Sequence, residues 1–548
     1  MRLRTSLYRA VVIVVAAALV ITVQASPAAA LDPPVIGEPY GSLVFQTGSP
    51  SIPVYNSNGL GWTVVNSISG AQVGHGQVTG DMVTPNGLPP GLFTLTVSNS
   101  RGTTTAVFLV VGETPSPDPY FGVQTHFAFP DPTTWSAPEK TLPALQEIGF
   151  SSIRDESYWQ YTEKTPGERK IIDGVARYQR TATSLNLNRL FTADFGNTAV
   201  QDSLGVCDSQ DPVPCQRVPE TPAEQHQFAR YAIAVLDQTA VQRVELWNEF
   251  NHPAFNYRCK TGACYARIFG PIADEIKKAH PEVQIIGGGL SGADMAWFED
   301  FYAAGGLKHA FDAVSYHPYS DPQNKDLDTY GGYLERAKNV RDAQKRYLPS
   351  GAAPVPILLT EVGWTTVPQS VPGNPARALD DTVQGERLAS TYIIHAHAGA
   401  ETVYWYEGVD LGFDPDCPEL NFGVFRTTTA TVRSFQPKKA ALALRVLRDQ
   451  VDGYTQTGLE KLDSGVWRAT YTNGPLTKLA LFADSVLSAE ASSSSNPTTV
   501  AADSVIPAGE TVGSAVDAFG SPVDLSGSSI TLSSRPVYVT LSNSAISF

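Results

Sequence analysis

Two spacings of apolar residues alternate through the middle of the chain. Short, densely apolar runs typical of buried strands are separated by segments such as Pro222–Leu236, in which apolar residues recur at helical spacing. This alternation predicts parallel strands joined by helices. Eight successive units favour a closed (β/α)8 TIM barrel over an open doubly wound sheet. The expected strands are Phe121–Phe127, Ser152–Glu156, Arg189–Asp194, Arg243–Glu249, Gln284–Gly288, Ala313–Tyr319, Ile357–Trp364 and Val403–Glu407.

The regions on either side of the expected barrel have a different pattern. Period-two alternation between Gly, Ser and Thr turns, as in Leu92–Val97 and Thr105–Val110, predicts a small antiparallel β-sandwich. A last helix is expected over Pro437–Val451, and runs such as Thr477–Phe482 and Arg535–Leu541 predict a second β-sandwich after it. The predicted division is an N-terminal Ig-like sandwich over residues 31–113, a linker over 114–119, the barrel over 120–451 and a C-terminal sandwich over 452–548.

The N-terminal segment has the pattern of a secretory signal peptide. Positive charges in Met1–Arg4 precede the apolar run Val11–Val20, and the small residues Ala28–Ala30 follow. We therefore expect residues 1–30 to be removed and the mature protein to be secreted. An uncleaved anchor is the alternative, but the apolar run is short for a bilayer. Since no later segment is long and apolar enough to span, no membrane association is expected after cleavage.

Charge narrows the class of partner. The 548 residues carry a formal net charge of −15, which argues against nucleic acid or an anionic membrane as a partner. A neutral or weakly charged substrate fits better. A chain of this length also exceeds what one core usually supports, so two to four domains are expected. We expect the protein to be a monomer.

Four of the five cysteines lie at two expected loops. Cys207 and Cys215 bracket one loop and Cys259 and Cys264 bracket a second, which in an oxidising compartment predicts two loop staples or one cross-link between the loops. Cys417 is left over. A zinc site is the competing interpretation, but no His-x-x-x-His or repeated Cys-x-x-Cys accompanies these residues.

Two glutamates at the ends of apolar strands are the main candidates for chemistry. In barrel enzymes the reactive groups lie at the C-terminal ends of the strands. Glu249 ends expected strand four and Glu361 lies near the end of expected strand seven. Retaining cleavage of a glycosidic bond needs one carboxyl group that protonates the leaving oxygen and a second, about 5 to 5.5 Å away, that attacks the anomeric carbon. Strands four and seven can provide that gap across a barrel mouth.

The sequence around both glutamates resembles clan A of the glycoside hydrolases. Trp247-Asn248-Glu249 and, later, Thr360-Glu361-Val362-Gly363-Trp364 are similar to the clan's motifs after strands four and seven. The resemblance implies that Glu249 is the general acid/base and Glu361 the nucleophile. Gly122–His126, Gly149–Arg154 and Tyr316–Tyr319 most resemble family 39 and related bacterial polysaccharide hydrolases. Phe250 departs from the Pro that commonly follows the acid/base, which predicts a different turn there.

The resemblance also implies roles for residues near other strand ends. Asn248 is expected to hydrogen-bond the sugar 2-hydroxyl. Arg154 is expected beside Glu361, where its charge would keep the carboxylate ionised. His317 and Tyr319 end expected strand six, where similar enzymes use a Tyr to hydrogen-bond the nucleophile.

Further residues are expected at the edge of the site. His126 and Trp405 are predicted to line the sugar subsite, with Trp159 and Trp364 as weaker stacking candidates. Asp155 and Asp194 also lie near strand ends, but helix capping is the interpretation that we favour for both.

The predicted function is retaining hydrolysis of an oligo- or polysaccharide through a covalent glycosyl-enzyme. No metal or organic cofactor is expected, because two carboxyl groups suffice for this chemistry. Transglycosylation by the same site is one alternative, since it differs only in whether water or a sugar intercepts the intermediate. A non-catalytic carbohydrate-binding protein is another, and a cell-surface protein with the sandwiches as adhesion modules is a third.

Overall fold

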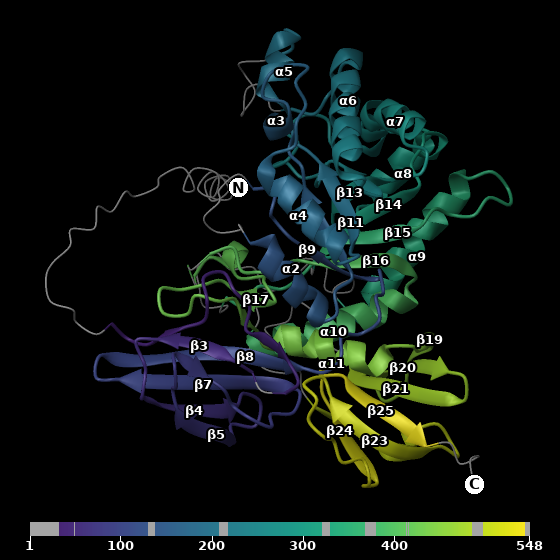
Figure 1. Cartoon of the computed structure of the whole chain (residues 1–548). Helices are drawn as coiled ribbons and strands as arrows, with labels where there is room; N and C mark the ends of the chain where they lie inside the picture. Colours follow the sequence, from purple (N-terminus) through teal and green to yellow (C-terminus); the bar gives the residue numbers. More distant parts are fainter. Residues whose placement is uncertain are drawn as a thin grey trace, which may run out of the picture.

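Eight parallel strands close into a barrel at the centre of the molecule (Figure 1). The computed structural model describes residues 32–48, 50–129, 137–207, 217–319, 329–367, 380–412, 414, 416–484 and 497–542. Each strand pairs in parallel with its neighbour in the sequence, and the last pairs with the first, which confirms the predicted (β/α)8 barrel. The strands are β9 (Phe121–Gln124), β10 (Ser152–Glu156), β11 (Asn188–Ala193), β12 (Arg243–Leu246), β13 (Gln284–Ser291), β14 (Ala313–His317), β15 (Ile357–Val362) and β16 (Ala400–Trp405).

Helices cover the outside of the barrel. The clearest start signal belongs to the helix at Pro222, where the Thr221 hydroxyl accepts from the Glu224 backbone and the Glu224 side chain accepts from the Thr221 backbone. Its apolar positions then face the strands, as the periodicity predicts. The helices are α2 (Pro138–Glu147), α3 (Trp159–Thr162), α4 (Asp173–Ser184), α5 (Thr198–Ser203), α6 (Pro222–Thr239), α7 (Gly262–Ala279), α8 (Met295–Ala303), α9 (Tyr330–Tyr347), α10 (Asp381–His397) and α11 (Lys439–Val451).

The barrel interior changes from apolar to polar along its axis. A separate apolar cluster, with one residue from each of five strands, fills the lower part: Leu190, Ile286, Ala313, Leu358 and Tyr404. Because alternate residues of a strand face the same side, the residues two positions further along continue the interior upward. Thr192 and Ser315 occupy those positions and are fully buried. The floor of the barrel mouth is therefore polar.

The N-terminal region forms two facing sheets, as predicted. The larger has the order β2-β8-β7-β4-β5 and the smaller the order β1-β3-β6. Alternate residues of the long strands point inward, and Phe93 and Phe108 stack at 5.5 Å between ring centroids. The strands are β1 (Val35–Ile36), β2 (Val44–Gln46), β3 (Ile52–Tyr55), β4 (Gly61–Asn66), β5 (Gln72–Gln77), β6 (Met82–Val83), β7 (Gly91–Asn99) and β8 (Gly102–Val111).

A second β-rich region follows α11. A five-stranded sheet with the order β19-β20-β21-β25-β23 faces the pair β22-β24, and apolar side chains fill the space between them. This agrees with the predicted C-terminal sandwich. The strands are β19 (Thr455–Lys461), β20 (Val466–Asn473), β21 (Leu476–Ala483), β22 (Thr498–Ala501), β23 (Thr511–Asp517), β24 (Ser529–Leu532) and β25 (Val537–Ser542).

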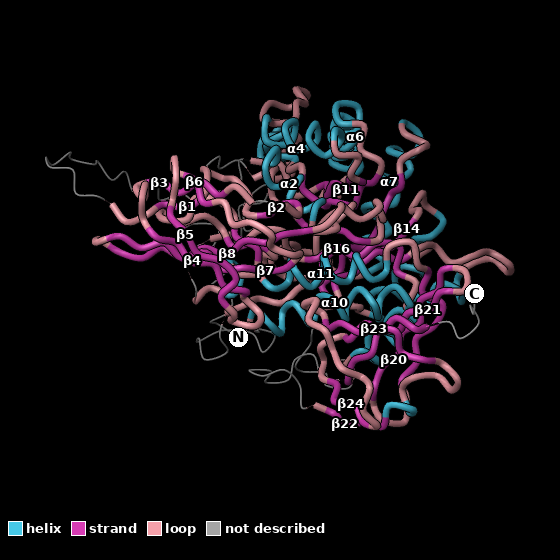
Figure 2. The backbone as a smooth tube through the Cα atoms, turned by 60° about the horizontal axis from the view of Figure 1, so that its bottom comes forward, coloured by secondary structure: helices cyan, strands magenta, loops and turns pink. Residues whose placement is uncertain are grey.

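Both sandwiches contact the barrel through the segments around α10 and α11 (Figures 1 and 2). Backbone hydrogen bonds tie the N-terminal region to the loop before α11, as from Ile36 N to Thr431 O at 2.9 Å. In the C-terminal region, the Arg535 guanidinium donates to the buried Glu386 carboxylate of α10 at 3.0 Å. The βα loops therefore surround the C-terminal ends of the barrel strands.

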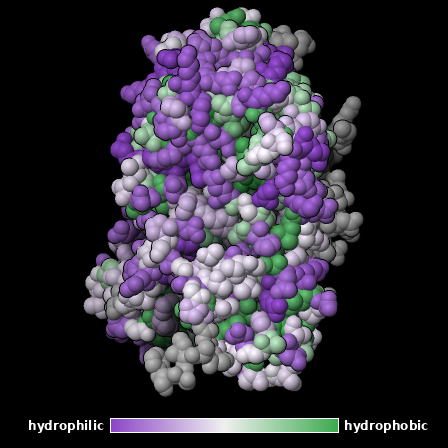
Figure 3. Space-filling model, turned by 90° about the vertical axis from the view of Figure 1, so that its right-hand side faces the viewer, coloured by the Kyte–Doolittle hydropathy of each residue, from purple (hydrophilic) through white to green (hydrophobic). Residues whose placement is uncertain are grey.

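Cys259 and Cys264, five positions apart in the sequence, form a disulfide. This agrees with the predicted disulfide within this loop. Cys207 is also disulfide-bonded, while Cys215 lies outside the described residues, as does the expected signal peptide. Within the described parts of the chain, no helix combines the length and apolarity needed to cross a bilayer. Hydrophilic residues predominate over the barrel helices on the face drawn in Figure 3, as expected for the outer sides of amphipathic helices.

Candidate active site

A tight turn after β12 presents Glu249 at the mouth of the barrel. The strand ends at Leu246, and Trp247 and Glu249 both adopt left-handed backbone conformations, with φ of 75° and 46°. Such conformations are uncommon for residues other than glycine and gather at functional sites. Phe250 anchors the turn, because its fully buried ring packs against Tyr265 at 5.1 Å between centroids. In this chain, buried Phe250 therefore fixes the turn at the position where the resemblance leads one to expect Pro.

The β13 strand must come very close to this turn. Gly289 O accepts from Glu249 N at 2.6 Å, and a Cβ on Gly289 would lie 2.7 Å from the Trp247 carbonyl oxygen. Gly289 also has a φ of 54°, so a side chain is disfavoured there on two grounds. A glycine at this position thus allows β13 to support the backbone of Glu249.

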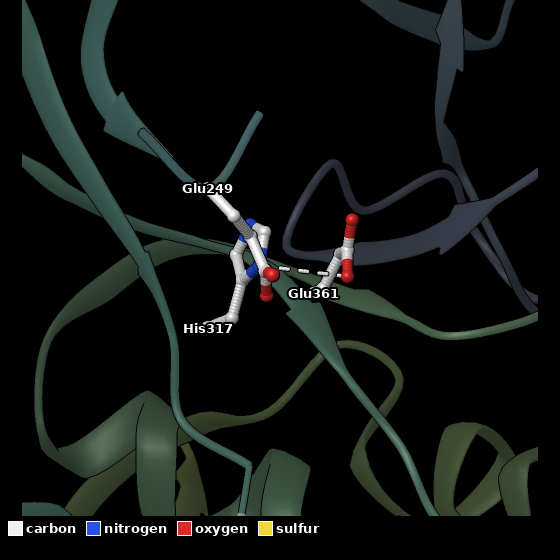
Figure 4. Close-up of side chains that lie close together, drawn as sticks. All are labelled: Glu249, His317 and Glu361. Atoms are coloured by element: carbon white, nitrogen blue, oxygen red, sulfur yellow. Dashed lines mark hydrogen bonds and ion pairs between the residues drawn. The ribbon is translucent and has the colours of Figure 1, made fainter. Parts of the chain in front are cut away.

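Glu249, Glu361 and His317 converge on one point at the barrel mouth (Figure 4). One carboxylate oxygen of each glutamate and a ring nitrogen of His317 all lie within 4.8 Å of one another. His317 Nδ1 is 3.1 Å from Glu249 Oε1 and 3.4 Å from Glu361 Oε2. The imidazole is fully buried, whereas both carboxylates are slightly exposed. A small molecule can therefore approach the carboxylates from the solvent side.

Arg154 connects the floor of the site to both sequence motifs. Its guanidinium donates to Glu361 Oε1 at 2.7 Å and to Asn248 Oδ1 at 2.9 Å. It also donates through Nε to Glu245 Oε2 at 2.8 Å and through Nη1 to Gln124 Oε1 at 2.8 Å. The planar guanidinium thus fixes several acceptors at once, which a lysine ammonium is less suited to do.

The surroundings of Glu361 favour its ionised form. Burial alone would raise the pKa of this carboxyl, but the nearby His317, Arg154 and His126 cations lower it below its usual value. The Tyr319 hydroxyl also donates to Glu361 Oε2 at 3.2 Å. Burial alone would lower the pKa of His317, yet the two glutamates raise it. Carboxylate and imidazolium therefore stabilise each other.

His126 lies between two further carboxylates. Its Nδ1 is 3.4 Å from Glu156 and its Nε2 is 3.2 Å from Glu407. Burial alone would lower the pKa of His126, but these carboxylates raise it well above its usual range. His126 therefore contributes positive charge to the site, as its effect on the Glu361 pKa also indicates.

The aromatic residue that β16 places beside the site is Tyr406, and the prediction of Trp405 for this role is wrong. Trp405 is fully buried and packs against Trp364 at 5.6 Å between ring centroids. Tyr404 and Tyr406 face the barrel axis because they are two residues apart, so the residue between them faces the helices. The Tyr406 ring lies 5.6 Å from that of His126.

The other tryptophan candidates and the two capping predictions are corrected as well. Trp159 and Trp364 are fully buried and offer no surface to a sugar. Asp155 accepts from the backbone of Phe127 at 2.8 Å, so it caps the loop after β9 rather than a helix. Asp194 does not cap a helix, since the residue that caps α5 is Asn197.

Sequence reasoning missed three glutamates that the structure brings to the site. Glu245 is fully buried in β12, where it pairs with Arg154 and accepts from the Ser315 hydroxyl at 2.6 Å. Glu156 and Glu407 pair with His126. A signal was present, because a lone Glu between Val244 and Leu246 interrupts an apolar strand, and a buried charge needs a partner.

The convergent group could also coordinate a cation. In the part of the chain that the structure describes, Glu249, His317 and Glu361 are the group whose oxygen and nitrogen atoms lie close enough together to hold a metal ion. Two carboxylates and an imidazole suit several divalent metals. Metal-free chemistry therefore stays a prediction that calls for its own test.

Comparisons with known proteins agree on the architecture. Neither protein-family models nor curated protein sequences give a match. Among solved structures, the chain is similar to a family 39 glycoside hydrolase from Bacteroides cellulosilyticus, with a TM-score of 0.72 and 20% identity over 92% of this chain and 100% of that one. The chain shares its fold. A family 39 enzyme from Xanthomonas axonopodis pv. citri is similar at a TM-score of 0.50 and 15% identity, over 78% of this chain and 95% of that one. A glucosidase from Croceicoccus marinus is similar at a TM-score of 0.50 and 14% identity, and the match covers 78% of this chain and 97% of that one.

Proposed function

We propose that the protein is a retaining glycoside hydrolase in which Glu361 is the nucleophile and Glu249 the general acid/base. The observation that carries the proposal is that one carboxylate oxygen of Glu249 lies within 4.8 Å of one carboxylate oxygen of Glu361 across the barrel mouth. Retaining enzymes need about 5 to 5.5 Å between the two groups, whereas inverting enzymes need about 6.5 to 9.5 Å to admit a water molecule. Fold similarity to glycoside hydrolases supports the same reaction class.

In the first step, Glu361 attacks the anomeric carbon while the bond to the leaving oxygen breaks. Glu249 transfers its proton to that oxygen, so the product leaves as a neutral alcohol. Arg154 and Tyr319 both donate to Glu361, and they keep its carboxylate ionised and oriented for attack. Asn248, held by Arg154, is suited to bind the 2-hydroxyl of the sugar.

In the second step, Glu249 takes a proton from water, the water oxygen attacks the anomeric carbon, and the bond to Glu361 breaks. His317 contacts both carboxylates, so its positive charge stabilises whichever of them is ionised. Both glutamates return to their starting protonation states. Two inversions at the anomeric carbon give net retention.

Azide distinguishes the two proposed roles. With Glu249→Ala, the glycosyl-enzyme should still form from substrates with good leaving groups, and azide should then yield a glycosyl azide of the original configuration. With Glu361→Ala, azide should occupy the vacant nucleophile site and yield the inverted azide. NMR of the products reports the configuration. Exchanged outcomes would reverse the assignment, and full activity in either variant would remove that residue from the mechanism.

Chelation tests the alternative that the three convergent side chains hold a catalytic metal. We expect full activity after dialysis against EDTA, because the two-carboxylate mechanism needs no metal. Activity that EDTA abolishes and a divalent ion restores would instead assign Glu249, His317 and Glu361 to a metal centre.

Export from the cell is also part of the proposal. The Cys259–Cys264 disulfide is typical of an oxidising compartment, and the N-terminal pattern is that of a signal peptide. N-terminal sequencing of protein recovered from culture medium tests this directly. We expect the mature chain to begin near Leu31.

A further inference from the structure

A row of aromatic rings crosses the βα loops along one side of the mouth. Phe129, Tyr158, Phe195, Phe255 and His252 follow one another, and we call them the aromatic strip. Successive ring centroids are separated by 6.4, 6.2, 5.5 and 5.7 Å. The rings come from the loops after β9, β10, β11 and β12, so four separate loops contribute to one continuous row of rings.

The strip is not part of the closed core. Phe129 is 37% exposed, and the other four residues are partly exposed. Large aromatic side chains usually lie inside, and apolar surface that gathers in one place usually marks a binding site. The buried Trp247 supports the strip from below, with its ring 5.3 Å from that of Phe195.

One end of the strip lies beside a proposed catalytic group, because His252 Nδ1 is 4.0 Å from Glu249 Oε2. Further along the strip, Tyr158 lies near Glu156, which pairs with His126. Burial raises the pKa of the Tyr158 hydroxyl most, and the Glu156 charge raises it further. A glycan bound at the two glutamates would therefore continue directly onto the strip.

We propose that the aromatic strip binds further sugar residues of a neutral oligo- or polysaccharide, on either side of the linkage being cleaved. The inference rests on the proposed function and specifies its substrate class. The C–H face of a sugar ring is apolar and its hydroxyls are polar, which matches aromatic rings at a wet cleft edge. The net charge of −15 disfavours anionic sugars and leaves a neutral glycan as the substrate class.

Substrate length provides the test. Wild type, Phe129→Ala and Phe255→Ala are assayed on 4-nitrophenyl glycosides of xylose, glucose, arabinose, galactose and mannose, and on the linear neutral hexasaccharides of the same sugars. For the sugar that is cleaved, we expect wild type to favour the hexasaccharide over the aryl glycoside in kcat/KM by about tenfold or more. Each strip substitution should lower that ratio about three- to tenfold, mainly through KM.

Tyr347→Ala is the matched control. Tyr347 is an aromatic residue that is 44% exposed, but it ends α9 and so lies toward the opposite face of the barrel. We expect it to leave the ratio at the wild-type value. Phe129→Ala keeps the test valid if Phe255→Ala fails to fold, because Phe129 lies at the surface.

The outcomes separate this inference from the proposed function. Equal efficiency on aryl glycoside and hexasaccharide, or strip variants with an unchanged ratio, would overturn the strip as a sugar-binding surface while the hydrolase stands. Absence of cleavage of every substrate by wild type would overturn both. A fall in the ratio for Tyr347→Ala as large as for Phe129→Ala would mean that the effect does not come from the strip.

Discussion

Buried charges occur in two regions of the molecule and are arranged differently. At the barrel mouth, the Arg154 guanidinium faces the carboxylates of Glu245 and Glu361, and His317 joins Glu361 to Glu249. In the loop region before α11, Lys438 pairs with Asp410 alone at 2.6 Å. The first cluster reaches the surface through Glu249, which His317 joins to it and which is partly exposed, whereas both members of the second are buried.

The hydrogen bonding differs in the same way. The Lys438 ammonium donates to Asp410 Oδ1, to Thr366 Oγ1 and to Asn421 O, which uses its three donors. At the mouth, Arg154 and His317 hold Glu361 from the inside, and Glu249 on the other side of His317 keeps part of its surface open to solvent. The sealed pair therefore satisfies itself, while the mouth cluster retains a carboxylate that can react with a substrate.

The pKa shifts support this contrast. Burial raises the pKa of Asp410 despite Lys438, and burial lowers that of Lys438 despite Asp410. Desolvation thus outweighs the attraction within the sealed pair. At the mouth the attraction prevails, because the pKa of Glu361 is lowered in spite of burial. The mouth maintains ionised groups, whereas the sealed pair carries an energetic cost.

Glu361→Gln should have the largest effect. Removal of the proposed nucleophile should lower kcat on the order of 10⁴- to 10⁶-fold. The free energy of unfolding should change by about 1 kcal/mol or less, since Gln keeps an acceptor for Arg154 and Arg154 keeps Glu245. Steady-state kinetics and urea unfolding measure the two quantities. A large loss of stability with residual activity would contradict the contrast between the regions.

Lys438→Met should have the opposite profile. It leaves Asp410 buried without its cation, which typically costs about 3 to 5 kcal/mol of stability. Activity per folded molecule should be retained, because Lys438 makes none of the contacts at Glu249 or Glu361. Urea unfolding with kinetics normalised to the folded fraction checks both parts. An unchanged free energy of unfolding would mean that the Lys438–Asp410 pair does not contribute to stability as its geometry indicates.

Arg154→Lys should shift the pH dependence. A lysine keeps the charge but cannot reproduce the guanidinium contacts to Glu245, Glu361 and Asn248. Since Arg154 helps to depress the pKa of Glu361, its loss should raise that pKa, and kcat/KM, which falls as pH drops through it, should decline at a higher pH. We expect about a tenfold or greater loss at acidic pH and a smaller one near neutrality. An acid limb that stays in place, or moves to lower pH, would contradict this.

The sequence predicted the barrel and its two glutamates because these follow from local patterns. Apolar runs, helical spacing and a carboxylate at a strand end can each be read within about ten residues. The choice between Trp405 and Tyr406 needed the facing of β16, where an error of one residue exchanges inside for outside. Glu245 was visible in the sequence, but its pairing with Arg154, which lies two strands away in the barrel, was not.

The sealed pair lay beyond sequence reasoning for a different reason. Lys438 and Asp410 are 28 residues apart and are joined by a loop whose path no periodicity predicts. The aromatic strip likewise depends on four loops that meet only in the folded barrel. Loop conformation, rather than strand pattern, therefore determines which residues accompany the two glutamates.

The smallest effect is expected when both members of the sealed pair are replaced together. Because burial outweighs attraction for both groups, the pair should contribute little net stability relative to apolar residues of similar size. Asp410→Leu combined with Lys438→Met should thus change the free energy of unfolding by about 1 kcal/mol or less, or increase it, although each single substitution is destabilising. Asp410 also accepts a hydrogen bond from Gly423 N at 2.8 Å. Loss of this bond in the double variant should lower the free energy of unfolding by about 1 kcal/mol at most. A double-mutant cycle measured by urea unfolding gives the coupling energy. If the double variant lost as much stability as the two single variants together, the two charges would act independently. The contrast between a buried pair that stabilises only itself and a mouth cluster that reacts with substrate would then be wrong.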